Sequence, residues 1–339
     1  MMSAGLRRSF TSLGEMAQKM QAYHYYKYGG PEEMILKEVD MPIPADKEVL
    51  VKVEAASFNA MDWRIMRGDP WLVRLAMGLR KPAKPQLGSD LAGIVVAVGK
   101  KVTQFKVDDH VFGTARFGAF AEYACTPEDR LIIKPRSVSF EDAAALPIAC
   151  GTAIQAAVHY ANIQPGQKVL IIGSCGGVGS FCTQLAKSLG AHVTAICRTG
   201  NVDMAKSLGA DEVLDYTKED VCKSGNLFDS VLDTGLFRSM FNYKAVMNPE
   251  GSTYLLIGGS GDKFVPALVQ APLASIFSKR KFSIVNFELD QNQLQKCLEL
   301  VESGKVKPAI CRRYKFDEIP TAMAYAEKGH MQGKVIVSM

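Results

Sequence analysis

A glycine-rich turn in the middle of the chain has the residue types that phosphate binding requires. The apolar run Val169–Ile172 leads into Gly173–Gly179, here called the glycine loop, and a helical pattern follows. Glycines let the backbone approach a pyrophosphate, and a helix N-terminus offers free N–H groups. The loop predicts a dinucleotide site, although Ser174 replaces the first glycine of the strict motif. The alternative is a loop that only turns a strand into a helix. The predicted contacts are Ser174, Cys175, Gly176, Gly177, Val178 and Gly179.

The end of the following strand decides which dinucleotide such a site prefers. An acidic side chain there bonds the ribose 2′-hydroxyl, whereas a basic one accepts a 2′-phosphate. Here the apolar run His192–Cys197 ends at Arg198, and no acid occurs before Asp203. An arginine can bind a phosphate through two N–H groups. Arg198 therefore favours NADPH, the alternative being a solvated loop charge.

Strands and helices alternate along the middle of the chain. Alternation at this spacing indicates a parallel sheet that is covered by helices on both faces. The predicted strands are Lys168–Ile172, His192–Cys197, Glu212–Leu214, Phe228–Leu232 and Ser252–Ile257, and the predicted helices are Val178–Leu189 and Val202–Leu208.

The two ends of the chain differ from this middle part. Residues 22–134 read as short strands punctuated by Gly and Pro. The tail contains two amphipathic helical patterns, Leu289–Glu302 and Lys315–Glu327, and a final strand, Lys334–Val337. We therefore expect an α/β fold. A doubly wound parallel domain (141–287) would be inserted into a mostly β domain built from residues 21–140 and 288–339.

Composition argues against several classes of protein. The net charge is only +5 and no basic stripe is interleaved with aromatics, so nucleic acid is not an expected partner. Two uncharged stretches, Ala143–Gln167 and Val169–Ala186, are broken by Pro or Gly and read as buried core rather than membrane spans. Eight cysteines without a CxxC pair suggest free thiols in a reducing compartment.

The first twenty residues have the profile of a mitochondrial presequence. Arg7, Arg8 and Lys19 face a single acid, Glu15, and apolar residues fall on one helical face. The alternatives are a disordered extension, or an upstream start codon ahead of Met20. We expect a cytoplasmic protein, or a mitochondrial matrix protein if residues 1–20 are a presequence.

Short motifs are spread over almost the whole chain. They are Tyr28–Gly30, Ser57–Trp63, Gly88–Val95, Phe105–Gly113, Gly118–Tyr123, Ala143–Pro147, the glycine loop and Gly329–Val335. Together they resemble the zinc-independent, quinone oxidoreductase-like branch of the medium-chain dehydrogenase/reductase superfamily. The resemblance implies a Rossmann domain inserted into a GroES-like catalytic domain. It also implies a homodimer joined edge to edge near Phe282–Phe287.

The same resemblance assigns roles to individual residues. Asn59 would orient the nicotinamide ribose or the substrate carbonyl, and Thr152 would face the nicotinamide. The alternatives are a capped turn residue and a helix hydroxyl. Lys187 and Tyr216 would lie beside the adenosine phosphate; otherwise they are an exposed helix lysine and a half-buried ring. The other residues that the resemblance places at the cofactor are Ile257, Gly258, Val285, Phe287 and Lys334.

Zinc ligands are missing from the positions where related enzymes carry them. Zinc-dependent relatives have a cysteine at the position of Asn59 and Gly-His-Glu at Gly88–Asp90, and the five histidines form no ligand spacing. The sequence therefore predicts no metal. Without a Lewis acid, hydride transfer to a quinone or an α,β-unsaturated carbonyl is easier than oxidation of an alcohol. This small-molecule acceptor is the expected partner.

Two other functions stay open at this point. One is an enoyl-thioester reductase, for which Arg74, Arg80 and Lys81 would provide a basic entrance. The other is a cofactor-binding structural or regulatory protein with little turnover. Asp62, Trp63 and the segment Trp71–Lys81 are candidates to line an acceptor pocket, the alternative being packing and a surface arm.

Overall fold

A six-stranded parallel sheet forms one half of the molecule. The computed structural model describes residues 18–339 except 260, 277 and 330. The order β10-β9-β8-β11-β12-β13 is that of a doubly wound Rossmann sheet, whose ligands bind beyond the carboxyl ends of the strands. The strands are β8 (Lys168–Ile172), β9 (His192–Cys197), β10 (Glu212–Asp215), β11 (Ser230–Asp233), β12 (Ser252–Leu256) and β13 (Arg280–Ile284).

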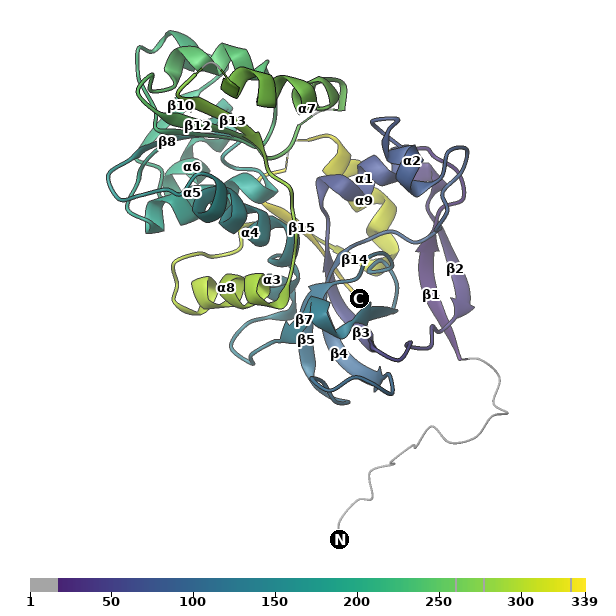
Figure 1. Ribbon diagram of the computed structural model, residues 1–339. Coiled ribbons are helices and arrows are strands. Elements are labelled where there is room, and N and C mark those ends of the chain that lie inside the picture. The colour runs from purple at the N-terminus through teal and green to yellow at the C-terminus, as the bar shows by residue number, and fades with distance from the viewer. Residues whose placement is uncertain (1–17, 260, 277, 330) are drawn as a thin grey trace.

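Helices cover both faces of this sheet (Figure 1). One face carries α4 (Pro147–Ile154), α5 (Gly177–Ser188) and α6 (Val202–Ser207), and the opposite face carries α7 (Gly261–Ile276). Successive side chains of β8 pack against opposite faces of the sheet. Val169 packs in the same apolar cluster as Phe181 of α5, whereas Leu170 packs in the cluster that contains Ala267 of α7. Burial on both faces explains why this strand is apolar throughout.

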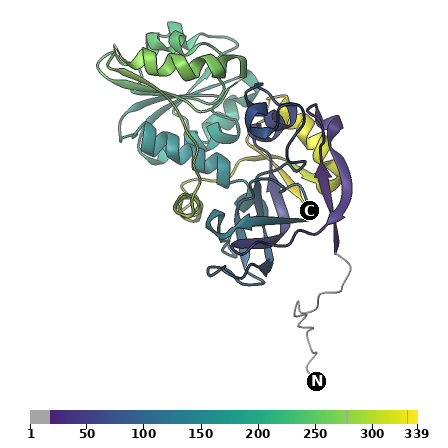
Figure 2. The ribbon, with the colours of Figure 1, turned by 45° about the vertical axis from the view of Figure 1, so that its right-hand side comes forward.

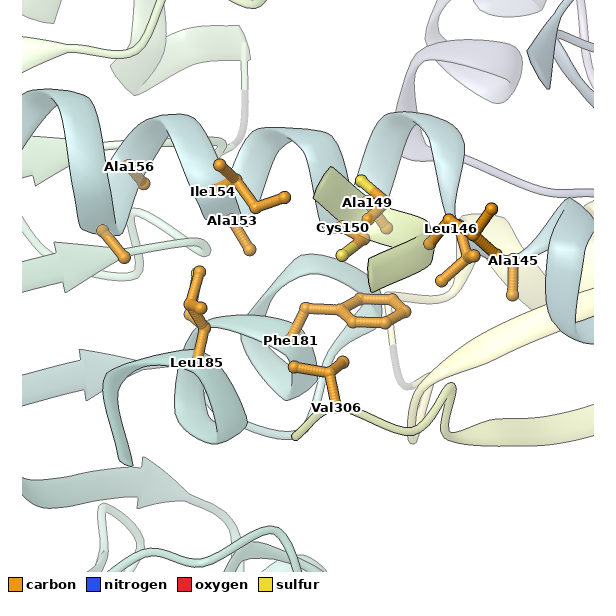
Figure 3. Packing of buried hydrophobic residues seen from close by; sticks show 14 of the residues in the cluster. Ala145, Leu146, Ala149, Cys150, Ala153, Ile154, Ala156, Phe181, Leu185 and Val306 are labelled. Carbon is orange, nitrogen blue, oxygen red and sulfur yellow. The ribbon is translucent and has the colours of Figure 1, made fainter. Parts of the chain in front are cut away.

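Small side chains on α4 let α5 approach it closely. Figure 3 shows Phe181 and Leu185 of α5 pointing toward Ala149, Cys150 and Ala153 of α4. All five side chains are buried. Because interiors are closely packed, this contact fixes the N-terminus of α5 relative to α4. The glycine loop is thereby positioned against the helix that carries Thr152.

The other half of the molecule is a mostly antiparallel, GroES-like unit with a seven-stranded sheet. Its order is β14-β15-β3-β4-β5-β7, and β6 also pairs with β3. The strands of this unit, including a separate β1–β2 hairpin, are β1 (Lys19–His24), β2 (Ile35–Asp40), β3 (Glu48–Ser57), β4 (Asp90–Val98), β5 (His110–Thr114), β6 (Tyr123–Pro127), β7 (Leu131–Ile133), β14 (Ile310–Lys315) and β15 (Lys334–Ser338).

Both ends of the chain build this second sheet. Strand β15 pairs with β3 in the register Val337 to Ala56, so the C-terminal residues lie beside the N-terminal part of the chain. Figure 2 shows the two sheets as separate bodies, with yellow C-terminal elements beside purple and blue N-terminal ones. The expected insertion of a Rossmann unit into a GroES-like unit is confirmed. The remaining helices are α1 (Ala60–Arg67), α2 (Val73–Met77), α3 (Phe140–Ala144), α8 (Gln291–Glu302) and α9 (Ile319–Glu327).

Two expectations about element boundaries were wrong. Lys19 and Met20 belong to β1 rather than to an extension; the rest of the expected extension, residues 1–17, lies outside the described residues. The expected helix Lys315–Glu327 is divided, because Lys315 still pairs with Ser338 as the last residue of β14. A 3₁₀ turn follows, and α9 begins at Ile319, with Pro320 in its first turn as helix geometry allows.

The edges of the Rossmann sheet are β10 and β13. Strand β13 is the edge at which the sequence predicts pairing of two copies, and that homodimer stays a prediction. In the part of the chain that the structure describes, no helix combines the length and the apolar character needed to cross a membrane.

Candidate active site

The glycine loop turns sharply from β8 into α5. Gly173 has a φ of +75°, a left-handed conformation that glycine adopts without strain. A Cβ added at Gly179 would lie 2.0 Å from the carbonyl oxygen of Gly173, and one added at Gly173 would lie 2.5 Å from the hydroxyl oxygen of Thr234. Packing within the protein therefore requires glycine at these two positions.

Packing gives no such reason for the two glycines at the tip of the loop. A Cβ added at Gly176 would first meet another atom at 3.4 Å, and one added at Gly177 at 3.6 Å. Gly176 is the N-cap of α5, where backbone N–H groups are free to bind an anion. The bare backbone at this helix end thus fits the pyrophosphate of a dinucleotide.

The next side chains of the loop point into the protein. Ser174 Oγ donates a hydrogen bond to the Ile196 carbonyl at 3.2 Å, and Cys175 Sγ donates to the Asn201 carbonyl at 3.5 Å. Both side chains are buried, and Val178 packs against the core beside α4. These residues can therefore contact a dinucleotide through their backbone only.

Arg198 and Tyr216 lie at the same edge of the sheet as the glycine loop. Arg198 directly follows β9, is half-exposed, and its side chain makes no hydrogen bond or salt bridge with any described residue. Tyr216 follows β10, and its ring lies 5.9 Å from the ring of Phe237 at the mouth of a small cavity of about 60 Å³. The nearest acid, Asp215, accepts hydrogen bonds from Thr199 and Thr217. The cavity is also lined by Glu219, whose carboxylate is exposed and has no side-chain partner among the described residues, so this edge carries an acid as well as Arg198.

Lys187 lies at the wrong end of α5 for the role expected of it. It is in the last turn of that helix, and its Nζ is 2.5 Å from a carboxylate oxygen of Asp211, which precedes β10. The glycine loop, by contrast, lies at the other end of α5, beyond the carboxyl end of β8. The structure does not bring Lys187 to the loop.

The residues expected at the nicotinamide lie at the carboxyl ends of β12 and β13. Ile257 N donates to Asp233 O at 2.8 Å, and Val285 N donates to Leu256 O at 2.9 Å. A Cβ added at Gly258 would lie 3.2 Å from the Thr234 carbonyl oxygen, so this backbone is tightly held. Phe287 and Thr152 are also expected at the nicotinamide. The Phe287 ring borders Gly151, and the Thr152 hydroxyl donates to Ile148 O at 2.6 Å.

A buried polar network lies within the GroES-like half, where Asp90 also accepts a hydrogen bond from Ile148 of α4. Lys334 Nζ donates to Asn59 Oδ1 at 2.7 Å and to Phe58 O at 2.9 Å, and lies 3.5 Å from Asp90 Oδ2. Asn59 Nδ2 donates to Asp90 Oδ2 at 2.8 Å. Lys334 and Asp90 are at most 1% exposed. These three contacts occupy the Lys334 ammonium, so this charge is not free to bind a cofactor phosphate.

The two charges fix the orientation of the Asn59 amide. The ammonium can only donate, so the amide oxygen must face Lys334, and the carboxylate can only accept, so the NH₂ group must face Asp90. One N–H of Asn59 is thereby used, and the second stays available for a carbonyl or ribose oxygen. Asn59 is 8% exposed, so its surroundings hold it nearly dry.

Asp62 is a second buried carboxyl at this site. It sits in the first turn of α1, and its Oδ2 accepts from Asn59 N at 2.7 Å. Burial raises the pKa of Asp62 to about 7, against the lowering effect of that hydrogen bond. Burial also lowers the pKa of Lys334. Burial therefore favours the uncharged form of both side chains.

Asp62 should make the protein less stable as the pH rises toward neutrality. The fold keeps the Asp62 proton up to a pH of about 7, whereas the unfolded chain releases it near 3.8. The stabilisation that protonated Asp62 contributes is therefore fully present below its pKa in the unfolded chain. It is lost as the pH rises through its pKa in the folded protein. The free energy of unfolding is measured by urea denaturation at pH 5 and at pH 8. Between these two pH values it should fall by about 3 kcal/mol more in the unchanged protein than in Asp62→Asn.

Asp215→Asn is the control for this measurement. Hydrogen bonds, first from Thr199, lower the pKa of Asp215 to about 2, so its carboxylate titrates below this pH window. The variant should change the unfolding free energy by the same amount at both pH values. An Asp62→Asn curve that runs parallel to that of the unchanged protein would show that Asp62 is ionised throughout.

Two residues at the site were not identified from the sequence. Asp90 stands in the Gly88–Val95 motif and at a missing zinc ligand, but the sequence assigned it no role; its partner Ser57 on β3 is 33 residues away, so local spacing gave no signal. Arg64 of α1 donates from Nη2 to the Gly259 carbonyl and so ties the GroES-like half to the loop after β12. No motif marks Arg64, because its partner is 195 residues away.

A cavity bordered by Ser89 and Phe287 lies between the two halves of the molecule. The segment Trp71–Lys81 does not line it. Trp71 is 65% exposed, and Arg74 lies over the Tyr28 ring at 4.7 Å while donating to Gly68 O. Arg74 is thus occupied by contacts within its own half of the molecule. In the described ranges, no group of three His, Cys, Asp or Glu side chains is arranged to hold a metal ion.

Comparisons with known proteins agree with this architecture. A family model for the alcohol dehydrogenase GroES-like domain matches residues 45–136, and one for zinc-binding dehydrogenases matches residues 208–337. The chain is 34% identical to a chloroplastic quinone-oxidoreductase homolog of Spinacia oleracea, over 95% of this chain and 99% of that protein. It is 31% identical to the chloroplastic NADPH-dependent alkenal/one oxidoreductase of Arabidopsis thaliana, over 99% of this chain and 83% of that protein.

A solved structure is also similar over nearly its whole length. The quinone oxidoreductase from Coxiella burnetii superposes with a TM-score of 0.85 at 28% identity. The match covers 95% of this chain and 100% of that one.

Proposed function

This chain belongs to the quinone oxidoreductase branch of the medium-chain dehydrogenase/reductase superfamily, and from that premise we propose that it uses NADPH to reduce quinones or α,β-unsaturated carbonyls without zinc. One observation carries the proposal. The Lys334 side chain passes the tip of the glycine loop, with its Cδ 3.6 Å from a Cβ built at Gly177, and ends on Asn59. A dinucleotide on the loop would therefore lie beside the Asn59 amide.

The proposed cofactor site follows the carboxyl edge of the Rossmann sheet. The backbone of Ser174–Gly179 would hold the pyrophosphate, and Arg198 would bind the 2′-phosphate with Tyr216 beside it. The nicotinamide would be bordered by residues from α4 and from the ends of β12 and β13. These residues are Thr152, Ile257, Gly258, Val285 and Phe287. Lys187 is not included, because its ammonium is paired with Asp211 at the amino end of β10.

In the proposed reaction the protein aligns the acceptor and polarises it. NADPH, when bound, would supply a hydride from its nicotinamide ring, and the reduced acceptor would take up the proton that completes the reaction from solvent. The free N–H of Asn59 would donate to the acceptor carbonyl or to the nicotinamide ribose, and the Lys334 ammonium on the amide oxygen would strengthen that donor. The buried surroundings exclude water and so strengthen both hydrogen bonds.

The donor set supports a reaction without zinc. The position of one zinc ligand in related enzymes holds Asn59, whose amide nitrogen already donates to Asp90. Asp90 in turn lies 3.5 Å from the Lys334 ammonium, a fixed positive charge that would repel a divalent cation. A metal ion here would have to displace both contacts.

Turnover with a panel of acceptors tests the proposal. We expect NADPH oxidation, followed as loss of the reduced nicotinamide absorbance, with menadione or an alkenal, and no change in rate after dialysis against EDTA. Turnover restricted to crotonyl-CoA would instead support an enoyl-thioester reductase. Saturable NADPH binding without turnover of any acceptor would support a structural or regulatory role, and loss of activity in EDTA would contradict the zinc-free mechanism.

A further inference from the structure

A cavity of about 400 Å³ lies between the two halves of the molecule. Its lining comes from the GroES-like sheet and from the segment that follows β13. Among the residues that line it are Ser89, Arg116, Arg130, Ile148, Phe287 and Glu288. A cavity of this size accommodates a small organic molecule.

This cavity adjoins the network around Asn59. Ser89 and Ile148 flank Asp90: Ser89 precedes it in the chain, and the Ile148 N–H donates to its Oδ1 at 3.2 Å. The other carboxylate oxygen of Asp90 accepts from Asn59. Phe287 borders the cavity and touches α4 next to Thr152. An acceptor in the cavity would therefore reach the Asn59 amide, provided that the proposed function holds.

Two arginines are among the residues that line the cavity, Arg116 being exposed and Arg130 half-buried. Neither Arg116 nor Arg130 forms a side-chain hydrogen bond or salt bridge within the described part of the chain. The backbone on which each is carried is fixed. The Ala115 N–H donates to Ser89 O at 2.8 Å, and the Arg130 carbonyl oxygen would lie 2.0 Å from a Cβ added at Gly113. Both arginines thus line the cavity from backbone that packing and hydrogen bonding hold in place.

The acidic side chain in the lining, Glu288, offsets only one of these two positive charges. Glu288 accepts from Asn286 Nδ2 at 3.3 Å, so one of its oxygens already has a partner. Two cations and one anion leave the lining with a formal charge of +1. The lining also includes apolar side chains, among them Ile148 and Phe287. The lining suits a molecule with an apolar body and an anionic end.

We propose that the acceptor carries a carboxylate or a similar anion on an apolar body, and that Arg116 and Arg130 bind that anion. This inference deepens the proposed function and rests on it. A guanidinium presents paired N–H donors that match the geometry of a carboxylate. Binding the anion there would orient the conjugated carbonyl toward Asn59, so charge recognition and alignment for hydride transfer would be one event.

Benzoylacrylate and its methyl ester test the charge preference directly. Both contain the same conjugated ketone and differ in the carboxylate. The unchanged protein should show a higher kcat/KM for the acid relative to the ester. In Arg116→Met and Arg130→Met this acid-to-ester ratio should fall about tenfold each, as loss of a charge-assisted hydrogen bond predicts, while kcat/KM for the ester stays constant. Constant activity with the ester shows that the variants are folded.

Two further variants serve as matched controls. Arg136→Met removes an exposed arginine outside the cavity and should leave the ratio unchanged. Glu288→Gln removes the opposing charge and should raise the ratio. An unchanged ratio in the Arg116→Met/Arg130→Met double variant, with the ester still reduced, would overturn the anion site and leave the proposed function standing.

A binding measurement separates the two proposals if neither compound is reduced. Absence of turnover with every acceptor would contradict the proposed function. The saturated acid, benzoylpropionate, is then titrated into the NADPH-loaded protein by calorimetry. Weaker binding to the double variant than to the unchanged protein would support the anion site, and equal binding, or none to either protein, would overturn it.

Discussion

Arg198→Ala is expected to raise the KM for NADPH about 10- to 100-fold and to leave the KM for NADH nearly unchanged. The two cofactors differ only in the 2′-phosphate, so an arginine that binds this group affects one of them. Arg198 follows β9 at the carboxyl edge of the sheet, and its side chain has no hydrogen-bond partner among the described residues. Steady-state kinetics with a saturating acceptor measure both constants.

Lys187→Ala is the matched control for this experiment. It also removes a basic side chain from the Rossmann half. Lys187, however, is paired with Asp211, which lies at the amino end of β10 and away from the glycine loop. We expect it to change neither KM. Equal losses for NADPH and NADH in Arg198→Ala would remove Arg198 from the 2′-phosphate site. A selective loss in Lys187→Ala would restore the role that the family resemblance implied for it.

Lys334→Met is expected to lower the free energy of unfolding by about 3–5 kcal/mol, the usual cost of leaving one charge of a buried pair alone. Methionine fills a similar volume but leaves the Asp90 carboxylate buried without its cation. Lys334 is 1% exposed, so water cannot replace the ammonium. Urea denaturation at a fixed pH gives the change. The activity should also fall, because the Asn59 amide loses one of the two charges that orient it.

The double variant Asp90→Asn/Lys334→Met separates stability from orientation. With both charges gone, most of the lost stability should return, yet nothing fixes which end of the Asn59 amide faces the acceptor. We therefore expect kcat/KM to stay low. Full activity in the double variant would mean that the network supports the fold alone.

Lys134→Met controls for the removal of a buried lysine as such. Lys134 is 5% exposed, but its ammonium donates to the carbonyls of Pro135 and Val138 and has no carboxylate partner. Its loss strands no charge, so the cost should be the smaller one of hydrogen bonds, roughly 1–3 kcal/mol. A loss as large as that of Lys334→Met would show that burial, rather than pairing with Asp90, sets the cost.

The Rossmann half could be predicted from the sequence because local patterns determine it. Strand β8 is apolar on both faces, and the glycines after it satisfy steric demands within a few residues, as Gly179 against Gly173 shows. Alternation of strands and helices then leaves few possible topologies. The same locality made Arg198 recognisable, since its place depends only on where β9 ends.

The polar network could not be predicted, because its members meet only in the folded chain. Lys334 and Asn59 are 275 residues apart, and a buried lysine in a final strand resembles any other lysine in a sequence. Lys187 shows the converse difficulty. A sequence motif placed it on α5, but it did not tell that Lys187 lies at the end of that helix away from the glycine loop. Arg116 and Arg130 were missed because the cavity they border needs both halves of the molecule.

The position of β15 within its sheet has a consequence for synthesis of the protein. All strands of the Rossmann sheet have been made once Ile284 has left the ribosome, so that unit can fold while the chain is still growing. The GroES-like sheet lacks an interior strand until residues 334–338 follow. Lys334 arrives with that strand. A chain that stops before Lys334 would therefore contain the parallel-sheet unit but lack the ammonium that orients Asn59.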